Sequence, residues 1–327
     1  MTVGEFLVQW IEATRMKLRP RTVERYAGII ENHVRPVLGV VPLQRITPLD
    51  LERAYAEWLR GGLSARTVAQ HHRMLHRALQ DAVTWGLIST NPVAKASPPR
   101  WDPPEMRALD RDEVMQLMAA VRGTRIEAIV VLALATGMRR GELLGLRWRD
   151  VDLEDGVLRV AQALQRLDNG LASTTPKTRE SVRQVKIGPE AATVLRRQKL
   201  LIQKARLAWG PAWQGDKWDL VFPREDGQPL SPNWLSAAFR RAVEKAGFKP
   251  PLPRFHDLRH TFTTLQAAAG TPIHVISKML GHSDVMTTLR IYAHVLPVQQ
   301  SQAALAADQL LSDALAAANS MPARKEL

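Results

Sequence analysis

The sequence predicts a mainly α-helical protein with a small antiparallel β-sheet, in which an α+β domain follows an all-α domain. Through the first ninety or so residues, apolar side chains recur at helical spacing. Two segments near the middle alternate like strands, and helical periodicity then returns. A proline-rich segment without periodicity separates the two parts. We therefore expect a helical domain at residues 1–95, a linker at 96–106 and a second domain at 107–327.

Four helices are expected in the first part. Thr2 and Glu5 form the capping box of the first helix, and the second begins near "RPRTVERYAGII" and ends before Pro36. The third has Thr47 as its N-cap and Pro48 in its first turn. The fourth covers "SARTVAQHHRMLHRALQDAVTWG".

The second part mixes helices and strands. The predicted strands are "GVLRVAQAL" and "VRQVKIG", with Asn169 and Gly170 as a turn signal between them. The predicted helices are "DRDEVMQLMAAV", "RIEAIVVLALAT", "PEAATVLRRQKLLIQKARL", "SPNWLSAAFRRAVEKAG" and "HDLRHTFTTLQAAAG". The second of these is apolar nearly all round, which predicts a buried helix.

The composition favours a polyanionic partner. Lys and Arg number 45 against 32 Asp and Glu, a net charge of +13, and contacts to phosphates gain affinity by releasing counterions. A surplus of charge for solubility is the alternative. The absence of cysteine excludes disulfides and thiolate chemistry. The sequence has no apolar run long enough to span a membrane and no secretory signal at its start, so a cytoplasmic protein is expected.

Arginines gather on two of the predicted helices in the first part. They are candidates for contacts with DNA phosphates, although such faces are often only solvated. The candidates are Arg19, Arg21, Arg25, Arg66, Arg73 and Arg77.

The segment "ATGMRRGELLGLRW" places an arginine at a helix junction. A buried helix stops at Gly137 and a new helix starts directly, so Arg139 lies beside the protein interior. A buried guanidinium needs an anion. Glu142, three residues on, can supply it, and a pair that merely ties two helices together is the alternative.

In "HDLRH", His256 and Arg259 share a helix face and can reach one small ligand. A metal site is the alternative, because His256 and His260 are four residues apart and His282 could be a third ligand. Against that alternative, Arg259 lies between the two histidines and would repel a cation. We expect no metal.

The segment "LGHSDVMTTLRIYAH" turns at Gly281, with His282 in the turn and Ser283 as the N-cap of a further helix. Tyr292 follows about two and a half turns later. A core tyrosine with a bonded hydroxyl is the alternative for this residue.

Together these residue types describe a phosphodiester site that works without metal. Arg139 and Arg259 can fork onto non-bridging oxygens and stabilise the charge that grows there. A histidine can take the proton of Tyr292, whose attack makes a covalent phosphotyrosine. Lys177, in "TTPKTRESVRQVKI", is a candidate acid for the leaving oxygen, although a lysine in a turn is normally solvated.

In their order and separation, "ATGMRRGELLGLRW", "PKTRESVR", "HDLRHTF", "LGH" and "TTLRIYAH" resemble the tyrosine recombinase (phage integrase) family. The resemblance spans Leu109 to about Leu296, and the preceding helical part is similar to that family's SAM-like core-binding domain. It implies Glu142 as support for the first arginine. The implied catalytic residues are Arg139, Lys177, His256, Arg259, His282 and Tyr292.

The resemblance implies an enzyme that cleaves and rejoins double-stranded DNA through a 3′-phosphotyrosine, without ATP, metal or cofactor. It also implies a homotetramer on two DNA sites that passes through a Holliday junction, sometimes with an accessory DNA-bending or directionality factor. The segment after Val298 is expected to dock on a neighbouring subunit. Family members often carry a further small N-terminal domain; here the first helix starts at Thr2, which predicts a simple integrase or a truncated start.

These residues are compatible with three candidate functions, of which a site-specific recombinase is the first. "PKTRESVR" favours integration or excision of a mobile element over resolution of chromosome dimers within the recombinase class. A catalytically idle DNA-binding regulator of the same fold is the second candidate, and the full set of catalytic residue types argues against it. A metal-dependent nuclease or phosphoesterase is the third, and it would need clustered acidic ligands, of which the site motifs offer few.

Overall fold

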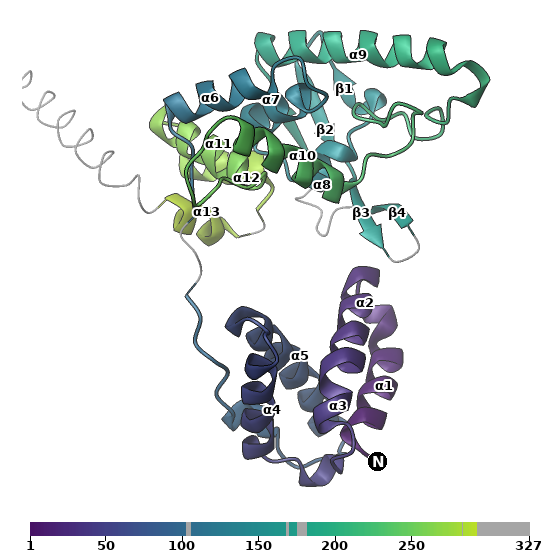
Figure 1. Ribbon diagram of the computed structural model, residues 1–327, viewed down its shortest axis with the longest axis vertical. Coiled ribbons are helices and arrows are strands. Elements are labelled where there is room, and N and C mark those ends of the chain that lie inside the picture. Colours follow the sequence, from purple (N-terminus) through teal and green to yellow (C-terminus); the bar gives the residue numbers. More distant parts are fainter. Residues whose placement is uncertain (103–105, 168–169, 175–181, 283, 293–327) are drawn as a thin grey trace, which may run out of the picture. The chain divides into compact units, whose positions relative to one another are not determined.

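The computed structural model describes residues 1–102, 106–167, 170–174, 182–282 and 284–292. The chain divides into two compact units, the first covering Met1–Glu105 and the second beginning at Met106. Figure 1 labels their α-helices and the strands other than β5. Among the described residues, no helix is long and apolar enough to cross a lipid bilayer.

The first unit is built from helices. Its α-helices are α1 (Val3–Thr14), α2 (Pro20–Ile29), α3 (Arg35–Leu38), α4 (Pro48–Arg60) and α5 (Ala65–Thr84). The predicted caps are confirmed, because Thr2 and Thr47 each take part in a capping box with the residue three positions on. Trp10 Nε1 donates to Asp81 Oδ2 at 2.6 Å and ties α1 to α5 across the buried core.

The second helix ends before Pro36, as predicted, but the chain stays helical beyond that end. At Ile29 the chain passes into a π-helical stretch, Ile30–Val34, and then directly into α3, with Pro36 in the first turn. The N–H groups in the first turn of an α-helix have no partner within that helix, so a proline there costs no hydrogen bond. The change of helical register before Arg35 therefore lets the chain stay helical through the proline.

The second unit is the α+β part, and the predicted fold class is confirmed. Its helices are α6 (Arg111–Val121), α7 (Glu127–Thr136), α8 (Arg140–Leu144), α9 (Pro189–Trp209), α10 (Pro232–Lys245), α11 (Asp257–Ala268), α12 (Ile273–Leu280) and α13 (Val285–Tyr292). Its strands are β1 (Val151–Asp152), β2 (Val157–Val160), β3 (Ala163–Leu167), β4 (Gly170–Thr174) and β5 (Arg183–Lys186).

The strands form two small antiparallel sheets. The order of one is β1-β2-β5, with Leu158 opposite Val185, and the other pairs β3 with β4. The prediction of a single strand over "GVLRVAQAL" is therefore wrong, because β2 ends at Val160 and β3 begins at Ala163 in a different sheet. Between them the side chain of Gln162 donates to the carbonyl of Gly145 at 2.8 Å, a contact with a segment outside both sheets.

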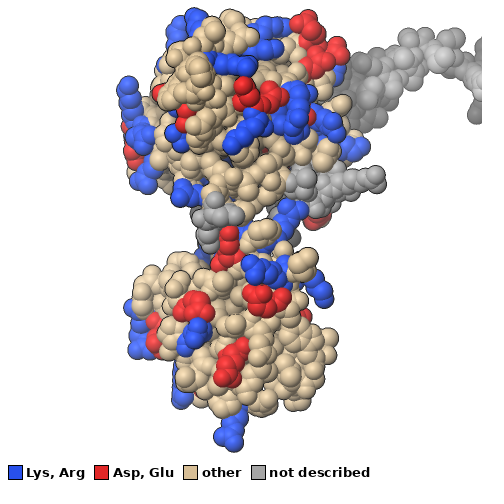
Figure 2. All heavy atoms as spheres, turned by 90° about the vertical axis from the view of Figure 1, so that its right-hand side faces the viewer, with Lys and Arg blue, Asp and Glu red and all other residues tan. Residues whose placement is uncertain are grey.

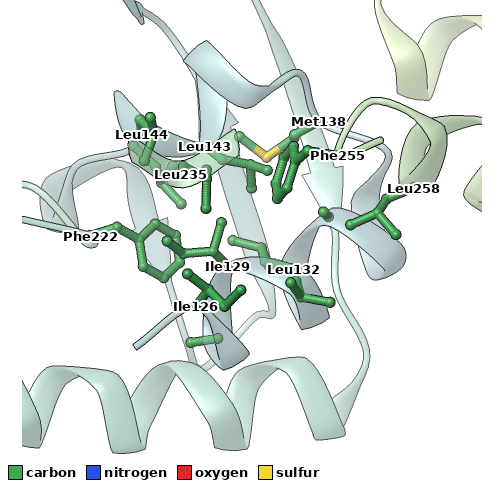
Figure 3. Close-up of a cluster of buried hydrophobic side chains, with 14 of the residues drawn as sticks. Ile126, Ile129, Leu132, Met138, Leu143, Leu144, Phe222, Leu235, Phe255 and Leu258 are labelled. Atoms are coloured by element: carbon green, nitrogen blue, oxygen red, sulfur yellow. The ribbon is translucent and has the colours of Figure 1, made fainter. Parts of the chain in front are cut away.

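The core of the second unit surrounds α7. This helix packs against α11 and against α9, and its side chains are buried on nearly all sides, as predicted. Figure 3 shows Ile129 and Leu132 of α7 among Phe222, Leu235 and Phe255, which come from other parts of the unit. The end of α7 is thereby fixed within the interior.

Gly137 ends α7 in the left-handed conformation, with φ at 61°. A Cβ atom at this position would lie 2.5 Å from Cδ1 of Phe262 and 2.7 Å from Cδ2 of Leu280. Only glycine permits both the backbone conformation and the close approach of α11 and α12. The residue therefore lets three segments that carry candidate site residues meet.

Gly137→Ala is expected to destabilise the second unit by about 2 to 4 kcal/mol, because left-handed strain adds to overpacking. Thermal unfolding should show a midpoint lower by roughly 5 to 10 °C. Gly247→Ala is the matched control, since Gly247 has φ at 80° with nothing within 4 Å of an added Cβ. Equal losses in the two variants would show that the close approach at Gly137 has no energetic weight.

Candidate active site

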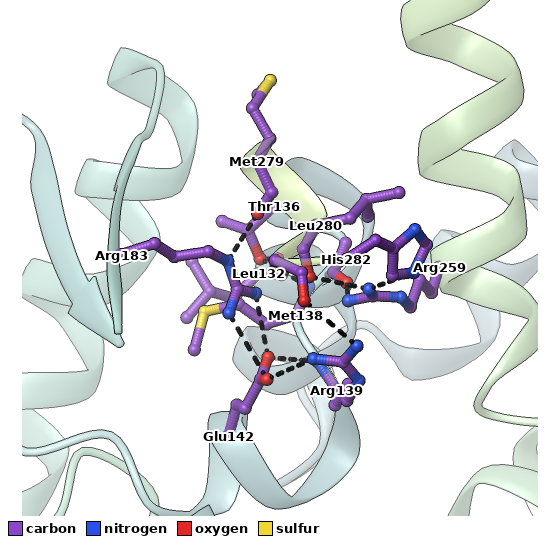
Figure 4. Close-up of polar contacts among 12 residues, drawn as sticks. Leu132, Thr136, Met138, Arg139, Glu142, Arg183, Arg259, Met279, Leu280 and His282 are labelled. Atoms are coloured by element: carbon purple, nitrogen blue, oxygen red, sulfur yellow. Dashed lines mark hydrogen bonds and ion pairs between the residues drawn. The ribbon is translucent and has the colours of Figure 1, made fainter. Parts of the chain in front are cut away.

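The predicted site residues Arg139, Glu142, Arg259 and His282 come together in the second unit, where the α7–α8 junction, α11 and the turn after α12 meet. Figure 4 shows their side chains joined by hydrogen bonds and ion pairs. Residues more than a hundred positions apart in the sequence thus form one cluster.

Arg259 lies at the centre and is 3% exposed. Its guanidinium donates to the carbonyl of Gly137 at 2.6 Å, to the carbonyl of Leu280 at 2.7 Å and to Nε2 of His282 at 2.8 Å. Gly137 and Leu280 lie at the C-terminal ends of α7 and α12, where backbone carbonyls lack helical partners and carry partial negative charge. Two helix ends thereby stabilise the buried cation.

Arg139 is the N-cap of α8 and has a 40% exposed side chain. Its Nη1 donates to Oε1 of Glu142 at 2.9 Å, and its backbone N–H donates to Oε2 of the same carboxylate at 2.9 Å. Nη2 also reaches the carbonyl of Gly281 at 3.5 Å. The predicted Arg139–Glu142 pair is therefore present, and the guanidinium keeps a face open to solvent.

Arg183 of β5 belongs to the cluster, and the sequence analysis missed it. Its side chain is 6% exposed, Nη2 donates to Oε2 of Glu142 at 2.9 Å, and Nε donates to the carbonyl of Met279 at 2.6 Å. One signal could have found it. Arg183 and Val185 are two residues apart in β5, so their side chains lie on the same face of the strand, and Val185 is buried.

The charges in the cluster do not balance. Arg139, Arg183 and Arg259 face the single carboxylate of Glu142, which leaves these four side chains with a surplus of positive charge. Burial, with Arg139 next, lowers the pKa of Arg259 to about 9, so it stays charged at neutral pH. Burial alone would raise the pKa of Glu142, but the hydrogen bond and charge of Arg183, followed by Arg139, hold it below its ordinary value. The surplus of positive charge favours the binding of an anion at the cluster.

The two predicted catalytic histidines are neutral at pH 7. Burial, followed by the charges of Arg259 and Arg139, lowers the pKa of His282 to about 4. His256, at the start of α11, reaches the surface; desolvation by the surrounding protein, then His260 and Arg259, lowers its pKa to about 4. Each ring therefore offers a lone pair on one nitrogen.

The alternative metal site on His256, His260 and His282 does not match the geometry. The rings of His256 and His260 are perpendicular, 5.3 Å between centroids, while both nitrogens of His282 are within 2.8 Å of Arg259 and Thr288 atoms. Within the part of the chain that the structure describes, no group of three His, Asp or Glu side chains could hold a metal ion.

Of two further predicted catalytic residues, the structure describes the backbone of Tyr292 and no part of Lys177. Tyr292 is the last residue of α13, a helix that packs against α11 and α12, and the description of Tyr292 ends with its backbone. Lys177 and the predicted N-cap Ser283 lie outside the described residues. The roles of Lys177 and Tyr292 remain predictions.

The predicted DNA-contacting arginines lie on the surface of the first unit. Arg21 and Arg25 are exposed on α2, and Arg19, at its N-cap, is half-buried. Figure 2 shows one face of the molecule, on which Lys and Arg side chains lie among fewer Asp and Glu side chains. The exposed arginines of α5 are Arg66, Arg73 and Arg77.

Glu142→Gln is expected to lower stability by about 3 to 5 kcal/mol at pH 7, because the buried guanidinium of Arg183 and the partly exposed one of Arg139 lose their counter-charge. The folded-state pKa of Glu142 is lowered, so its contribution is complete above the unfolded value of about 4.3 and is lost as pH falls through the folded value. Urea unfolding of wild type and variant should therefore differ most at pH 7 and less below pH 4. Glu154→Gln, at an exposed site, serves as control. A gap that widens in acid would contradict the assignment.

Comparisons with known proteins identify the family of the chain. Residues 107–298 match the model of the Phage integrase family, and residues 2–59 match the model "Phage integrase, N-terminal SAM-like domain". A XerC-like tyrosine recombinase of Caldanaerobacter subterraneus is 28% identical, the match covering 93% of this chain and 82% of the relative. A putative phiRv2 prophage integrase of Mycobacterium tuberculosis is 30% identical, over 89% of this chain and 74% of the relative.

Solved structures share the fold. The Tn1549 transposon integrase in complex with transposon right-end DNA has a TM-score of 0.78 at 24% identity, covering 94% of this chain and all of that one. Lambda integrase, solved as a tetramer bound to a Holliday junction, has a TM-score of 0.67 at 21% identity, covering 89% of this chain and 77% of that one. With these matches over most of its length, the chain belongs to the phage integrase family and is a tyrosine recombinase, an enzyme that cleaves and rejoins DNA.

Proposed function

We propose that this recombinase cuts and rejoins specific DNA sites through a covalent bond between Tyr292 and the DNA. One observation carries the proposal. Arg139, Arg259 and His282 meet beside α13, the helix that ends at Tyr292, and the cluster carries a surplus of positive charge. Such an arrangement suits a phosphodiester whose negative charge grows during the reaction.

In the proposed step the phenolate oxygen of Tyr292 attacks the phosphorus of the scissile phosphodiester. An O–P bond to tyrosine forms, and the bond from phosphorus to the 5′ oxygen of the next nucleotide breaks. That oxygen leaves with a proton as a free 5′ hydroxyl, and the strand remains on the enzyme as a 3′-phosphotyrosine. Attack by another strand's 5′ hydroxyl reverses the step. One P–O bond replaces another each time, so the step needs no ATP. Each role in it is assigned to a side chain, so the proposal includes no metal or cofactor.

Arg139 and Arg259 have different proposed roles because they differ in how deeply they are buried. Arg139 reaches the surface and can donate directly to a non-bridging oxygen, while Arg259 adds fixed positive charge from behind. Glu142 holds Arg139 in place, and Arg183 completes the pairing of that carboxylate. A donor already positioned for the transition state costs no reorganisation during the reaction.

Two further groups move protons in this proposal. His256 is neutral at pH 7 and can accept the phenol proton of Tyr292. Lys177 supplies a proton to the leaving 5′ oxygen, a role that rests on the motif "PKTRESVR" and on family membership. Without that proton the 5′ oxygen would depart as an alkoxide, which is a poor leaving group.

Partners and assembly follow from the relatives. Because integrase structures contain DNA, and lambda integrase forms a tetramer on a Holliday junction, we infer a homotetramer on two DNA sites. The segment after Val298 would contact a neighbouring subunit, and an accessory bending or directionality factor can assist. The proposed core-binding domain, residues 1–95, would contact phosphates through the exposed arginines of α2 and α5. The proposed compartment is the cytoplasm.

The proposed biological role is integration or excision of a mobile element, as the prophage and transposon integrases among the relatives suggest. The XerC-like relative supports a second candidate, resolution of chromosome dimers. Recombination between two unlike attachment sites would favour the first role, and recombination between two like sites the second. An idle DNA-binding regulator would perform neither.

Tyr292→Phe is expected to bind DNA as wild type does but to form no covalent complex, because the nucleophilic oxygen is gone. The measurement uses a nicked substrate with the junction sequence of the element that carries the gene. An SDS-resistant protein–DNA band should appear with wild type alone. Undiminished adduct in the variant would rule out Tyr292 as the nucleophile.

The same assay in EDTA distinguishes this chemistry from that of a metal-dependent nuclease. The adduct should form at an unchanged rate after chelation, because each proposed role belongs to a side chain. Loss of activity with EDTA, restored by a divalent cation, would support the metal-dependent alternative.

Arg183→Lys is expected to slow single-turnover cleavage about 10-fold or more while leaving DNA affinity within about threefold, because a lysine cannot span Glu142 and the carbonyl of Met279 together. Arg159→Lys is the control, since Arg159 is exposed on the neighbouring strand β2. If both variants cleave at the wild-type rate, Arg183 has no part in positioning Arg139.

A further inference from the structure

His282 lies between an arginine and a threonine. Its Nε2 is 2.8 Å from Nη2 of Arg259, and its Nδ1 is 2.7 Å from Oγ1 of Thr288. A guanidinium has only donors, so Nε2 must be the acceptor in the first contact. The ring proton of the neutral imidazole is then on Nδ1, which donates to the threonine hydroxyl. The contacts define one tautomer and one orientation of the ring.

Thr288 is placed to link this ring with the nucleophile. The residue is completely buried within α13, one helical turn before Tyr292, or about 6 Å along the axis. The other end of the chain of hydrogen bonds is Arg259 on α11. A movement of α13 away from α11 and α12 would break the Thr288–His282 bond. The position of the helix and that of the imidazole are therefore coupled.

We propose that Thr288 is a positioning residue for strand cleavage. Its hydroxyl keeps Nδ1 of His282 protonated and occupied, so that Nε2 accepts from Arg259 and helps to hold that guanidinium beside the phosphate expected there. It also ties the helix that ends at Tyr292 to that arginine, so that nucleophile and charge cluster are placed together. The consequence for cleavage rests on the proposed function of Tyr292; the tautomer of His282 does not.

The alternative is that Thr288 only fills space between α13 and its neighbours. Thr288→Val retains the branched shape and removes the hydroxyl, whereas Thr288→Ser retains the hydroxyl and removes a methyl group. A space-filling role predicts a larger loss for serine, and a positioning role predicts a larger loss for valine. Thr263→Val is the matched control, because Thr263 is equally buried and its hydroxyl bonds only to the carbonyl of Arg259 within its own helix.

The kinetic experiment measures single-turnover formation of the covalent complex, DNA affinity and the thermal unfolding midpoint for the full chain. Thr288→Val should slow adduct formation roughly 10- to 100-fold, as expected for a small misplacement of reacting groups. Its DNA affinity and unfolding midpoint should stay close to wild type. Thr288→Ser and Thr263→Val should react within about threefold of wild type.

The spectroscopic experiment needs no DNA. In protein labelled with ¹⁵N-histidine, with His282→Gln to assign the signal, His282 should show the Nδ1–H tautomer at pH 7. Thr288→Val should shift its populations toward the Nε2–H tautomer, and Thr288→Ser should not. An Nε2–H tautomer in wild type, or a spectrum unchanged by Thr288→Val, overturns the proposal.

The two experiments separate the possible failures. No adduct with wild type would count against the proposed function of Tyr292, and the spectra would still decide the role of Thr288. Wild-type adduct with an undiminished rate in Thr288→Val would overturn the positioning role. Equal slowing in the valine and serine variants would also overturn it, because the hydroxyl would then not be the cause.

Discussion

The carboxylate of Glu142 receives Arg139 and Arg183 at 2.9 Å each, in a place where it is only 5% exposed. Burying a carboxylate is costly unless its oxygens are paired, and here each oxygen accepts a guanidinium. The guanidinium of Arg183 is itself nearly buried, so it needs the carboxylate as much as the carboxylate needs it. This pairing joins α8 to β5 and sets where Arg139 can point, so the geometry of the site depends on it.

Arg259 is held by backbone carbonyls and not by a carboxylate. Its guanidinium bonds to carbonyls at the ends of α7 and α12, and each helix ends on a glycine in the left-handed conformation, Gly137 and Gly281. The dipoles of two helices compensate one cation only in part. Positive charge therefore remains for an incoming phosphate, and the same helix ends define the turn that carries His282.

Much of this could be predicted from sequence because it is local. The caps at Thr2 and Thr47, the stop at Gly137 and the pairing of Arg139 with Glu142 each involve residues within a few positions. Arg183 was missed because its depth depends on how β5 lies beside α12. The π-helical register before Pro36 and the break between β2 and β3 also depend on packing between segments. Helical and strand periodicity describe which face is apolar and contain no information about such partners.

The most direct test of the account is to find the atom that carries the DNA. After digestion of the covalent complex with trypsin and nuclease, mass spectrometry should place a nucleotide on the peptide that begins at Ile291, with fragmentation assigning it to Tyr292. The nucleotide should be attached through its 3′ phosphate. A nucleotide on a serine of that peptide or on another peptide, or a link through a 5′ phosphate, would contradict the proposed mechanism.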